Sequence, residues 1–124
     1  QIGWKQFSRL IFGNGGFYSY MNSTDFLKIE KMAEGGDREA MELIEAMAYQ
    51  VAKDTGGFAT VTGGKVDYIL MTGGMANSEL LVNLIRERIA FIAPIRIYPG
   101  EDEIQALNEG ALRVLNGEED ANRY

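Results

Sequence analysis

The feature that most constrains the fold is an apolar strand pattern followed at once by a helix and a second extended segment. The run VDYILM is nearly continuous in apolar residues and ends at Thr-Gly-Gly, residues 72–74. Asn77 or Ser78 can cap the helix expected over 78–89, and residues 95–98 are extended again. Two strands joined by a helix form a βαβ unit with parallel, neighbouring strands. Because the first run does not alternate, we expect its strand to be covered on both faces.

The rest of the chain is expected to be mostly helical. Residues 4–12 can form a short helix, Thr24 can cap a second one, and Asp37 can cap the longest. Residues 17–21 (FYSYM) alternate weakly and are predicted to form a short strand. A last helix follows the turn at 99–100, and four of its apolar residues are expected to face inward: Ile104, Leu107, Ala111 and Leu115. The predicted fold class is therefore α/β, helix-rich, with a small sheet that contains the βαβ unit.

Length and composition narrow the possible functions. At 124 residues the chain has the length of a single domain and can bury a hydrophobic core. Its net charge of -6 argues against a nucleic-acid partner held through phosphates. It contains neither Cys nor His, which excludes disulfides, thiolate chemistry, imidazole bases and the usual zinc sites. Any chemistry must use carboxylates, amides, hydroxyls, Lys, Arg, backbone groups or a bound metal.

The location of the protein is inferred from what the sequence lacks. No apolar run approaches the length needed to span a bilayer, and no signal peptide is visible, so we expect a cytoplasmic protein without a membrane partner. The chain begins at Gln1, directly ahead of the amphipathic segment WKQFSRLIF. That start favours a piece of a longer protein over a complete chain.

The Thr-Gly-Gly junction at 72–74 has two explanations. A plain βα turn is the simpler one, because glycine adopts positive φ at no steric cost. Alternatively, the flat backbone and the free N–H groups of residues 77–80 would face a nucleotide, since ligands of open parallel sheets bind at the carboxyl ends of strands. The sequence is neither GxGxxG nor GxxxxGKS/T, which disfavours a Rossmann site or a P-loop. The residues alone leave both explanations open, although the position in the βαβ unit favours a ligand.

A second motif, EDEIQALNEGA, follows the second strand. Its acids Glu101, Asp102 and Glu103 stand in the first turn of the last helix, where the helix dipole alone explains them. They are also candidates for holding Mg²⁺ through water, because this ion prefers oxygen ligands. Further along, Gly110 and Ala111 form a small-residue patch that permits close helix crossing, unless Gly110 is simply tolerated on the surface.

Together these motifs resemble the C-terminal region of butyrate kinases, in the acetokinase family. The resemblance includes VDYILMTGGMANSELL and IYPGEDEIQALNEGALRVLNGEE, as well as GNGGFYSYMNSTD and AMAYQVAK, so it covers nearly the whole chain. It implies the ribonuclease H-like lobe of the superfamily of acetate and sugar kinases, heat-shock chaperones and actin. Residues 1–124 would be the C-terminal part of the second, nucleotide-binding lobe, with the N-terminal lobe absent.

The resemblance also implies roles for particular residues. Six of them fall on the superfamily's adenosine motif and would lie at ATP: Thr72, Gly73, Gly74, Met75, Ala76 and Asn77. Residues 101–111 fall on its second connecting motif, whose Gly-Ala face packs against the other lobe at the hinge. In acetate kinases an acid near the start of this helix faces the metal, so Glu101, Asp102 and Glu103 are candidates for an indirect contact with Mg²⁺. No catalytic residue is assigned within the chain.

The function implied is phosphoryl transfer between ATP and a short-chain carboxylate, in which butyrate and ATP give butyryl phosphate and ADP. Family members are two-lobed chains with phosphate-binding hairpins and the substrate pocket upstream, and nothing in residues 1–16 resembles those hairpins. The chain alone is therefore expected to be inactive, and the parent to be a homo-oligomer. An acetate or propionate kinase and a non-catalytic nucleotide-binding module of the same superfamily are the alternatives, which the upstream coding sequence would separate.

Overall fold

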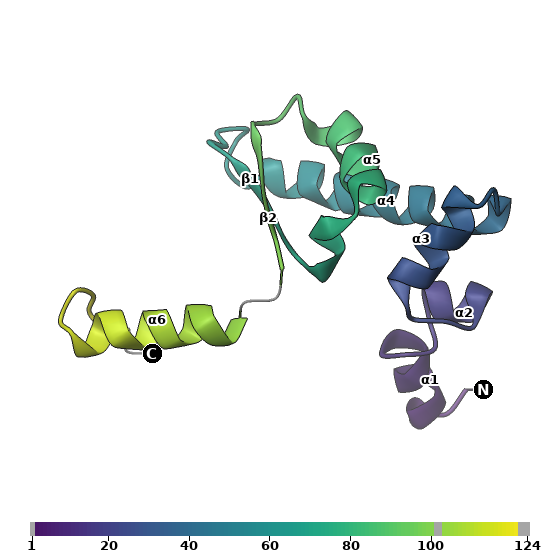
Figure 1. Cartoon of the computed structure of the whole chain (residues 1–124), viewed down its shortest axis with the longest axis horizontal. Coiled ribbons are helices and arrows are strands. Elements are labelled where there is room, and N and C mark those ends of the chain that lie inside the picture. The colour runs from purple at the N-terminus through teal and green to yellow at the C-terminus, as the bar shows by residue number, and fades with distance from the viewer. Residues whose placement is uncertain (1, 101–102, 122–124) are drawn as a thin grey trace.

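The computed structural model describes residues 2–100 and 103–121, and Figure 1 shows how their elements are arranged. In chain order they are α1 (Trp4–Ile11), α2 (Phe17–Met21), α3 (Phe26–Glu34), α4 (Arg38–Ala59), β1 (Ile69–Gly73), the single 3-10 turn η1 (Gly74–Asn77), α5 (Glu79–Ile89), β2 (Ile95–Pro99) and α6 (Glu103–Leu115). The fold is α/β and helix-rich, as predicted, with a two-stranded sheet in the described part. Across the described ranges, no helix is both long enough and apolar enough to cross a membrane.

Side-chain caps fix the start of three helices. Asp25 precedes α3, Asp37 precedes α4 and Ser78 precedes α5, and each accepts a backbone N–H from the residue three positions later. Such a cap satisfies a donor that has no partner within the helix. The caps of α4 and α5 agree with the sequence pattern. The predicted cap at Thr24 is wrong, because the carboxylate of Asp25 is the group that reaches the N–H of Lys28, at 3.2 Å.

Residues 17–21 form the helix α2, so the predicted strand is wrong. Gly16, at φ 58°, leads the chain into this helix, and its carbonyl accepts both the N–H and the hydroxyl of Ser19, at 3.1 and 2.8 Å. The ring of Phe17 then meets the ring of Phe26 edge-on, with centroids 5.9 Å apart. This packing against α3 favours a helix at residues 17–21. The weak alternation of these five residues contains no sign of the contact with Phe26.

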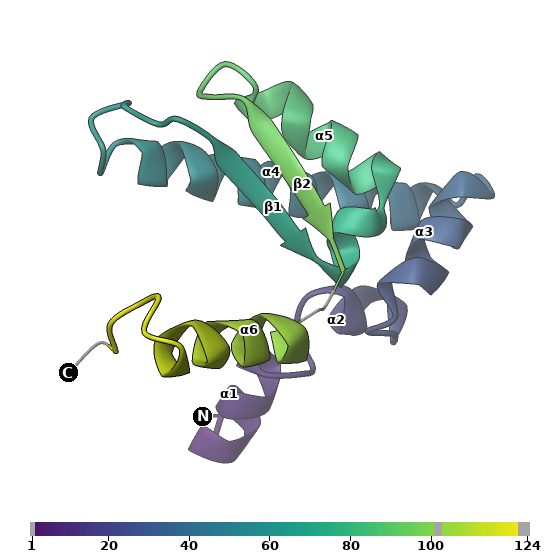
Figure 2. The same cartoon turned by 60° about the vertical axis from the view of Figure 1, so that its left-hand side comes forward.

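The strands β1 and β2 pair in parallel, as the βαβ pattern predicts, with Ile69 opposite Ile95 and Thr72 opposite Tyr98. Half-buried and exposed side chains alternate along β1. The helices α4 and α5 lie together on one side of the sheet (Figure 2), and the inward side chains pack against them. On the other face Leu70 is 65% exposed. The expected cover on both faces is therefore wrong for the described residues, in which helices cover one face only.

The hydrophobic core lies among α3, α4 and α5. Its largest fully buried side chains are Ile29, Ile44 and Ile89, one from each of these helices. On α4, Ala40 and Ala48 flank Ile44 at helical spacing, and these small side chains let the neighbouring helices approach closely. The apolar faces predicted for α3, α4 and α5 thus meet one another, and the sheet rests on the layer that they form.

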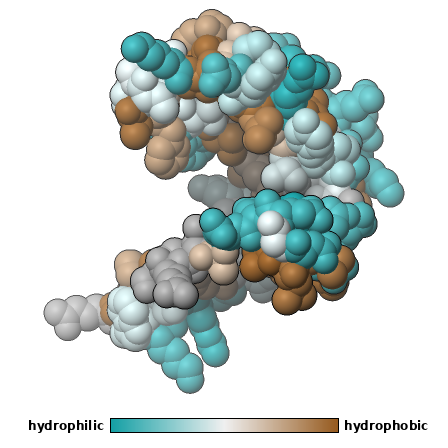
Figure 3. Space-filling model, turned by 90° about the vertical axis from the view of Figure 1, so that its left-hand side faces the viewer, coloured by the Kyte–Doolittle hydropathy of each residue, from teal (hydrophilic) through white to brown (hydrophobic). Residues whose placement is uncertain are grey.

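The helix α6 lies apart from this core (Figure 1), and a hollow separates the body of the molecule from the elements below it in the space-filling view (Figure 3). The apolar residues that were predicted to face inward are all exposed: Ile104, Leu107, Ala111 and Leu115. This prediction is wrong for the described chain. Helical spacing predicts which residues share a face, but the face is buried only where another element packs on it, and within residues 2–100 and 103–121 none does.

Candidate functional site

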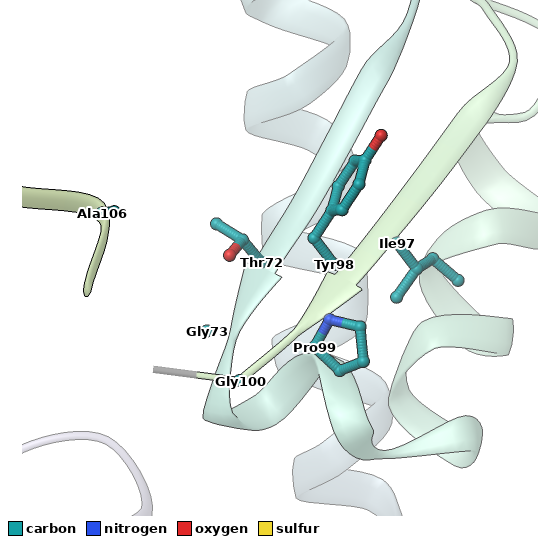
Figure 4. Close-up of a pocket in the computed structure, with 7 residues that line it drawn as sticks. All are labelled: Thr72, Gly73, Ile97, Tyr98, Pro99, Gly100 and Ala106. Atoms are coloured by element: carbon teal, nitrogen blue, oxygen red, sulfur yellow. The ribbon is translucent and has the colours of Figure 1, made fainter. Parts of the chain in front are cut away.

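A pocket of about 480 Å³ opens at the carboxyl ends of the two strands (Figure 4). Its lining comes from the ends of β1 and β2 and from the first turn of α6: Thr72, Gly73, Ile97, Tyr98, Pro99, Gly100 and Ala106. Its volume falls in the range of roughly 300–1,000 Å³ that small-molecule sites occupy. Ligands of open parallel sheets bind at this edge. The structure thus brings Thr72 and Gly73, two of the residues predicted at ATP, into a pocket.

The backbone of Gly73 is open toward this pocket. Gly73 ends β1 at φ 90° and ψ 173°, a conformation that is essentially restricted to glycine. A Cβ built on it would meet no atom within 4 Å. Gly100, at φ 123°, donates its N–H to the carbonyl of Gly73, with 3.4 Å between N and O. The strand ends therefore present backbone without side chains, which is what a ligand in contact with the main chain requires.

The residues after Gly73 turn immediately into η1. Gly74 lies within this turn and has no positive φ, so the strained position of the Gly-Gly pair is Gly73 alone. Met75 and Asn77 are exposed, and the amide Nδ2 of Asn77 donates to the carbonyl of Gly74 at 2.9 Å. Ala76 is buried, so its methyl group packs inside the molecule and only its backbone can face a ligand.

The start of α5 does not fit the prediction that the N–H groups of residues 77–80 are all free to face a nucleotide. The N–H of Ser78 donates to the carbonyl of Met75 at 3.1 Å, and Ser78 is 4% exposed. The Ser78 hydroxyl donates to the carboxylate of Glu30, so this end of α5 faces α3. Sequence analysis does not reveal Glu30, because it lies 48 residues from Ser78 and no local spacing connects them. A ligand at this edge would contact the strand ends and η1.

Two polar side chains stand on the open face of the sheet beside the pocket. Thr72 and Tyr98 are register partners, and in Figure 4 both point away from the side to which Ile97 points. Tyr98 is 61% exposed. An exposed aromatic ring can stack on a flat ligand, and both hydroxyls can donate or accept a hydrogen bond. Sequence analysis does not single out Tyr98, although its place at the end of the second strand, in register with Thr72, is the signal that would identify it.

The four arginines that the structure describes in the C-terminal half do not converge on this pocket. Three of them make local hydrogen bonds on the surface: Arg86 with Asn83, Arg88 with the carbonyl of Leu84, and Arg113 with Glu119. The fourth, Arg96, lies over the ring of Tyr68, with its guanidinium carbon 5.2 Å from the ring centroid. None of the four lines the pocket. They form a solvated surface rather than a phosphate site.

The predicted magnesium candidates fall at the gap in the described chain. Glu101 and Asp102 lie outside the described residues, and Glu103 is described only as the first residue of α6. In the part of the chain that is described, no three His, Cys, Asp or Glu side chains are grouped so that they could hold a metal ion. The carboxylates at 101–103 have the oxygen donors that Mg²⁺ prefers, so a metal contact there stays a prediction.

The pocket offers an open backbone, an aromatic ring and a threonine hydroxyl. This combination suits the binding of a flat, partly apolar ligand. The described residues that line it include no carboxylate, Lys or Arg, so proton transfer or charge neutralisation would require groups other than these. In a scan of the sequence against protein-family models, no model matches.

Proposed function

We propose that residues 1–124 are the C-terminal part of the nucleotide-binding lobe of a butyrate kinase, a ribonuclease H-like lobe of the actin and acetate kinase type. The parent enzyme transfers a phosphoryl group between ATP and butyrate, giving butyryl phosphate and ADP. The observation that carries this proposal is the pocket at Gly73, where the backbone at the end of a parallel strand is open to a ligand. The resemblance of residues 72–77 to an adenosine motif supports the same location.

The arrangement of the sheet supports a piece of a larger lobe. In the described chain, β1 pairs with β2 along one edge only. A strand edge that is left unpaired presents N–H and C=O groups that can join a further strand. Leu70 and Tyr68 are also exposed on the outer face of the sheet, where no described helix covers them. Further strands of a parent lobe would pair with the edge, and its helices would cover these side chains.

In this proposal the residues of the chain bind and orient adenosine. The backbone of Gly73 and Gly100 lets the nucleoside approach the strand ends closely, because neither residue has a side chain. The ring of Tyr98 supplies an aromatic surface for the base, and the hydroxyl of Thr72 supplies a hydrogen-bonding group. These groups hold the nucleoside end of ATP and leave the phosphates to other groups.

Mg²⁺, when bound, neutralises the charge of the phosphates, and one of the candidate acids Glu101, Asp102 and Glu103 would contact it through water. Phosphoryl transfer depends mostly on positioning and charge neutralisation, so this lobe needs neither a nucleophile nor a histidine of its own. The groups that contact the transferred phosphoryl group and butyrate would lie elsewhere in the parent. For this reason we assign no catalytic residue within the chain.

Binding is tested by an NMR titration of the isotope-labelled chain with ATP. We expect shifts confined to residues 72–77 and 97–100, with millimolar or weaker affinity because the opposing lobe is absent. Butyrate alone is the matched control and should leave these signals unchanged. Shifts outside the strand ends, or equal shifts with butyrate, would contradict an adenosine site at Gly73.

The reaction is tested on the full-length protein by acyl-hydroxamate formation from ATP and a carboxylate. We expect butyrate to be the preferred acceptor. A preference for acetate or propionate would contradict butyrate as the acceptor but would still support phosphoryl transfer to a short-chain carboxylate. ATP binding without product from any of the three acids would favour a non-catalytic nucleotide-binding module.

A further inference from the structure

A partly buried hydrogen bond joins α3 to the start of α5, immediately after the loop at residues 72–77. The hydroxyl of Ser78 donates to Oε1 of Glu30, and the same Ser78 oxygen accepts the N–H of Leu81 at 2.9 Å. Ser78 is 4% exposed and Glu30 is half-buried. One serine oxygen therefore acts both as the cap of α5 and as the attachment point for a carboxylate of another helix.

The Glu30 contact differs from the other side-chain hydrogen bonds of the molecule. Among the residues that the structure describes, every other hydrogen bond between two side chains joins residues at most six positions apart. The bond from Ser78 spans 48 positions. Apart from the backbone bonds that join the loop to β2, the other hydrogen bonds near the loop are local, such as that from the Asn77 side chain to the carbonyl of Gly74. In the described chain, Glu30 is thus the side chain that joins the C-terminal end of the loop to a distant helix through a side-chain hydrogen bond.

The helix that carries Glu30 is itself packed on the core. Its neighbour Ile29 is 0% exposed and belongs to the core between α3 and α4. Asp25 caps α3, and the helix runs from there through Glu30 to Glu34. The backbone that carries Glu30 is therefore held in a capped helix that the buried Ile29 packs against the core.

We infer that Glu30 is a positioning residue for the adenosine-binding loop. It acts through Ser78, which lies one residue beyond Asn77, while the buried Ala76 packs η1 against the body of the molecule. When the Ser78 hydroxyl is held, η1 and the open backbone of Gly73 are held at a defined distance from β2. The inference rests on the proposed function only for the identity of the ligand, because the attachment of the loop is a property of the fold.

Three variants distinguish a positioning role of Glu30 from a general contribution to the stability of the fold. Glu30→Ala removes the acceptor but leaves the Ser78 cap of α5 in place. Glu30→Gln keeps a side-chain oxygen that can accept from the hydroxyl, so it should restore the loop. Glu34→Ala is the matched control, because Glu34 is an exposed glutamate one turn further along the same helix.

The first measurement is amide hydrogen exchange in the 124-residue chain, which needs no ligand. The N–H groups of Ser78, Leu81 and Val82 are the reporters, since each makes a hydrogen bond at the start of α5. We expect Glu30→Ala to raise their exchange rates by about tenfold or more, the effect of losing a charge-assisted hydrogen bond. Rates for residues 44–52 in α4 should stay unchanged. Equal acceleration in both regions would show a merely structural role and overturn the inference.

The second measurement is the ATP titration of the same variants. We expect Glu30→Ala to raise the dissociation constant for ATP at least about fivefold, while Glu30→Gln and Glu34→Ala stay near the wild-type value. An unchanged constant for Glu30→Ala would overturn the inference even if exchange increases. If the unaltered chain shows no shifts with ATP at residues 72–77, the proposed nucleotide site fails, whereas the exchange experiment still decides whether Glu30 holds the loop.

Discussion

The N–H of Gly100 donates to the carbonyl of Gly73, with 3.4 Å between the two atoms. The bond joins the ends of β1 and β2 through two residues without side chains, both at positive φ. The last pair of the parallel ladder is Gly73 with Pro99, and the pocket lies against this pair and the backbone of Gly100. A tight turn and a ligand site would both require glycine at residue 73. The effect of a substitution on stability must therefore be measured separately from its effect on ligand binding.

Replacing Gly73 by alanine should lower both stability and ATP affinity. The backbone at φ 90° and ψ 173° disfavours any Cβ, so we expect the free energy of unfolding to fall by about 1–3 kcal/mol. The added methyl group meets no protein atom within 4 Å, so it extends into space that a ligand would use. Denaturant unfolding measures the first effect and the ATP titration measures the second. Loss of stability with unchanged ATP affinity would leave Gly73 as a turn residue only.

Gly57→Ala is expected to raise the free energy of unfolding, whereas Gly73→Ala lowers it. Gly57 lies inside α4, and a Cβ there would also meet nothing within 4 Å. Its φ is not positive, so alanine fits the helix and reduces the freedom of the unfolded chain. The free energy of unfolding should rise by about 0.5–1 kcal/mol. Denaturant unfolding followed by the helical circular dichroism signal tests this, and a decrease would contradict the helical assignment at residue 57.

Ile44→Val tests the core between α3, α4 and α5. Ile44 is 0% exposed, so removing one methylene should lower the free energy of unfolding by about 1 kcal/mol. The same substitution at Ile104, which is 85% exposed, is the matched control and should change it by less than about 0.5 kcal/mol. Similar effects at both positions would mean that α6 packs on the molecule in solution.

The candidate acids for Mg²⁺ are tested one at a time in the proposed full-length kinase, as Glu101→Gln, Asp102→Asn and Glu103→Gln. If one of them positions Mg²⁺, its amide variant should need more Mg²⁺ for half-maximal rate. An acid that acts only on the helix dipole should cost a few tenths of a kcal/mol of stability. Three unchanged Mg²⁺ titrations would rule out the metal role.

The 124-residue chain by itself should not transfer phosphoryl groups. Transfer requires phosphate, metal and acceptor carboxylate to be held in line in a closed site, and among the described residues no charged side chain lines the pocket. Acyl-hydroxamate formation from butyrate and ATP, at high protein concentration, is the direct assay. Turnover near the roughly 1–100 per second of ordinary kinases would show that the chain is not a partial lobe.

The parts of the fold that depend on local pattern were predictable. The βαβ unit follows from the spacing of apolar residues and glycines, and the caps at Asp37 and Ser78 follow from side chains that bond to the nearest free N–H groups. The location of the candidate site follows from topology, because parallel strands end at one edge. Each of these features depends on residues that are close together in the sequence, so the local pattern is enough to predict it.

The parts that depend on distant contacts were not predictable from the sequence pattern. Residues 17–21 are helical because Phe17 packs on Phe26, and a five-residue pattern contains no sign of this. Tyr98 enters the site through its register with Thr72, and Glu30 through a bond to Ser78. The periodicity of α6 was predicted correctly, but its exposure depends on the elements that surround it.

The core has a consequence for how the chain is made. The buried face of α4, with Ile44 at its centre, is covered by α5, which the ribosome completes about 30 residues after α4 ends. At the usual 5–20 residues per second, this face waits roughly 2–6 seconds for its partner. During that interval the nascent helix displays an uncovered apolar stripe, which is the kind of surface that chaperones bind. Slow codons in the segment between residues 60 and 78 would lengthen the wait, and they would raise the aggregated fraction without changing a single amino acid.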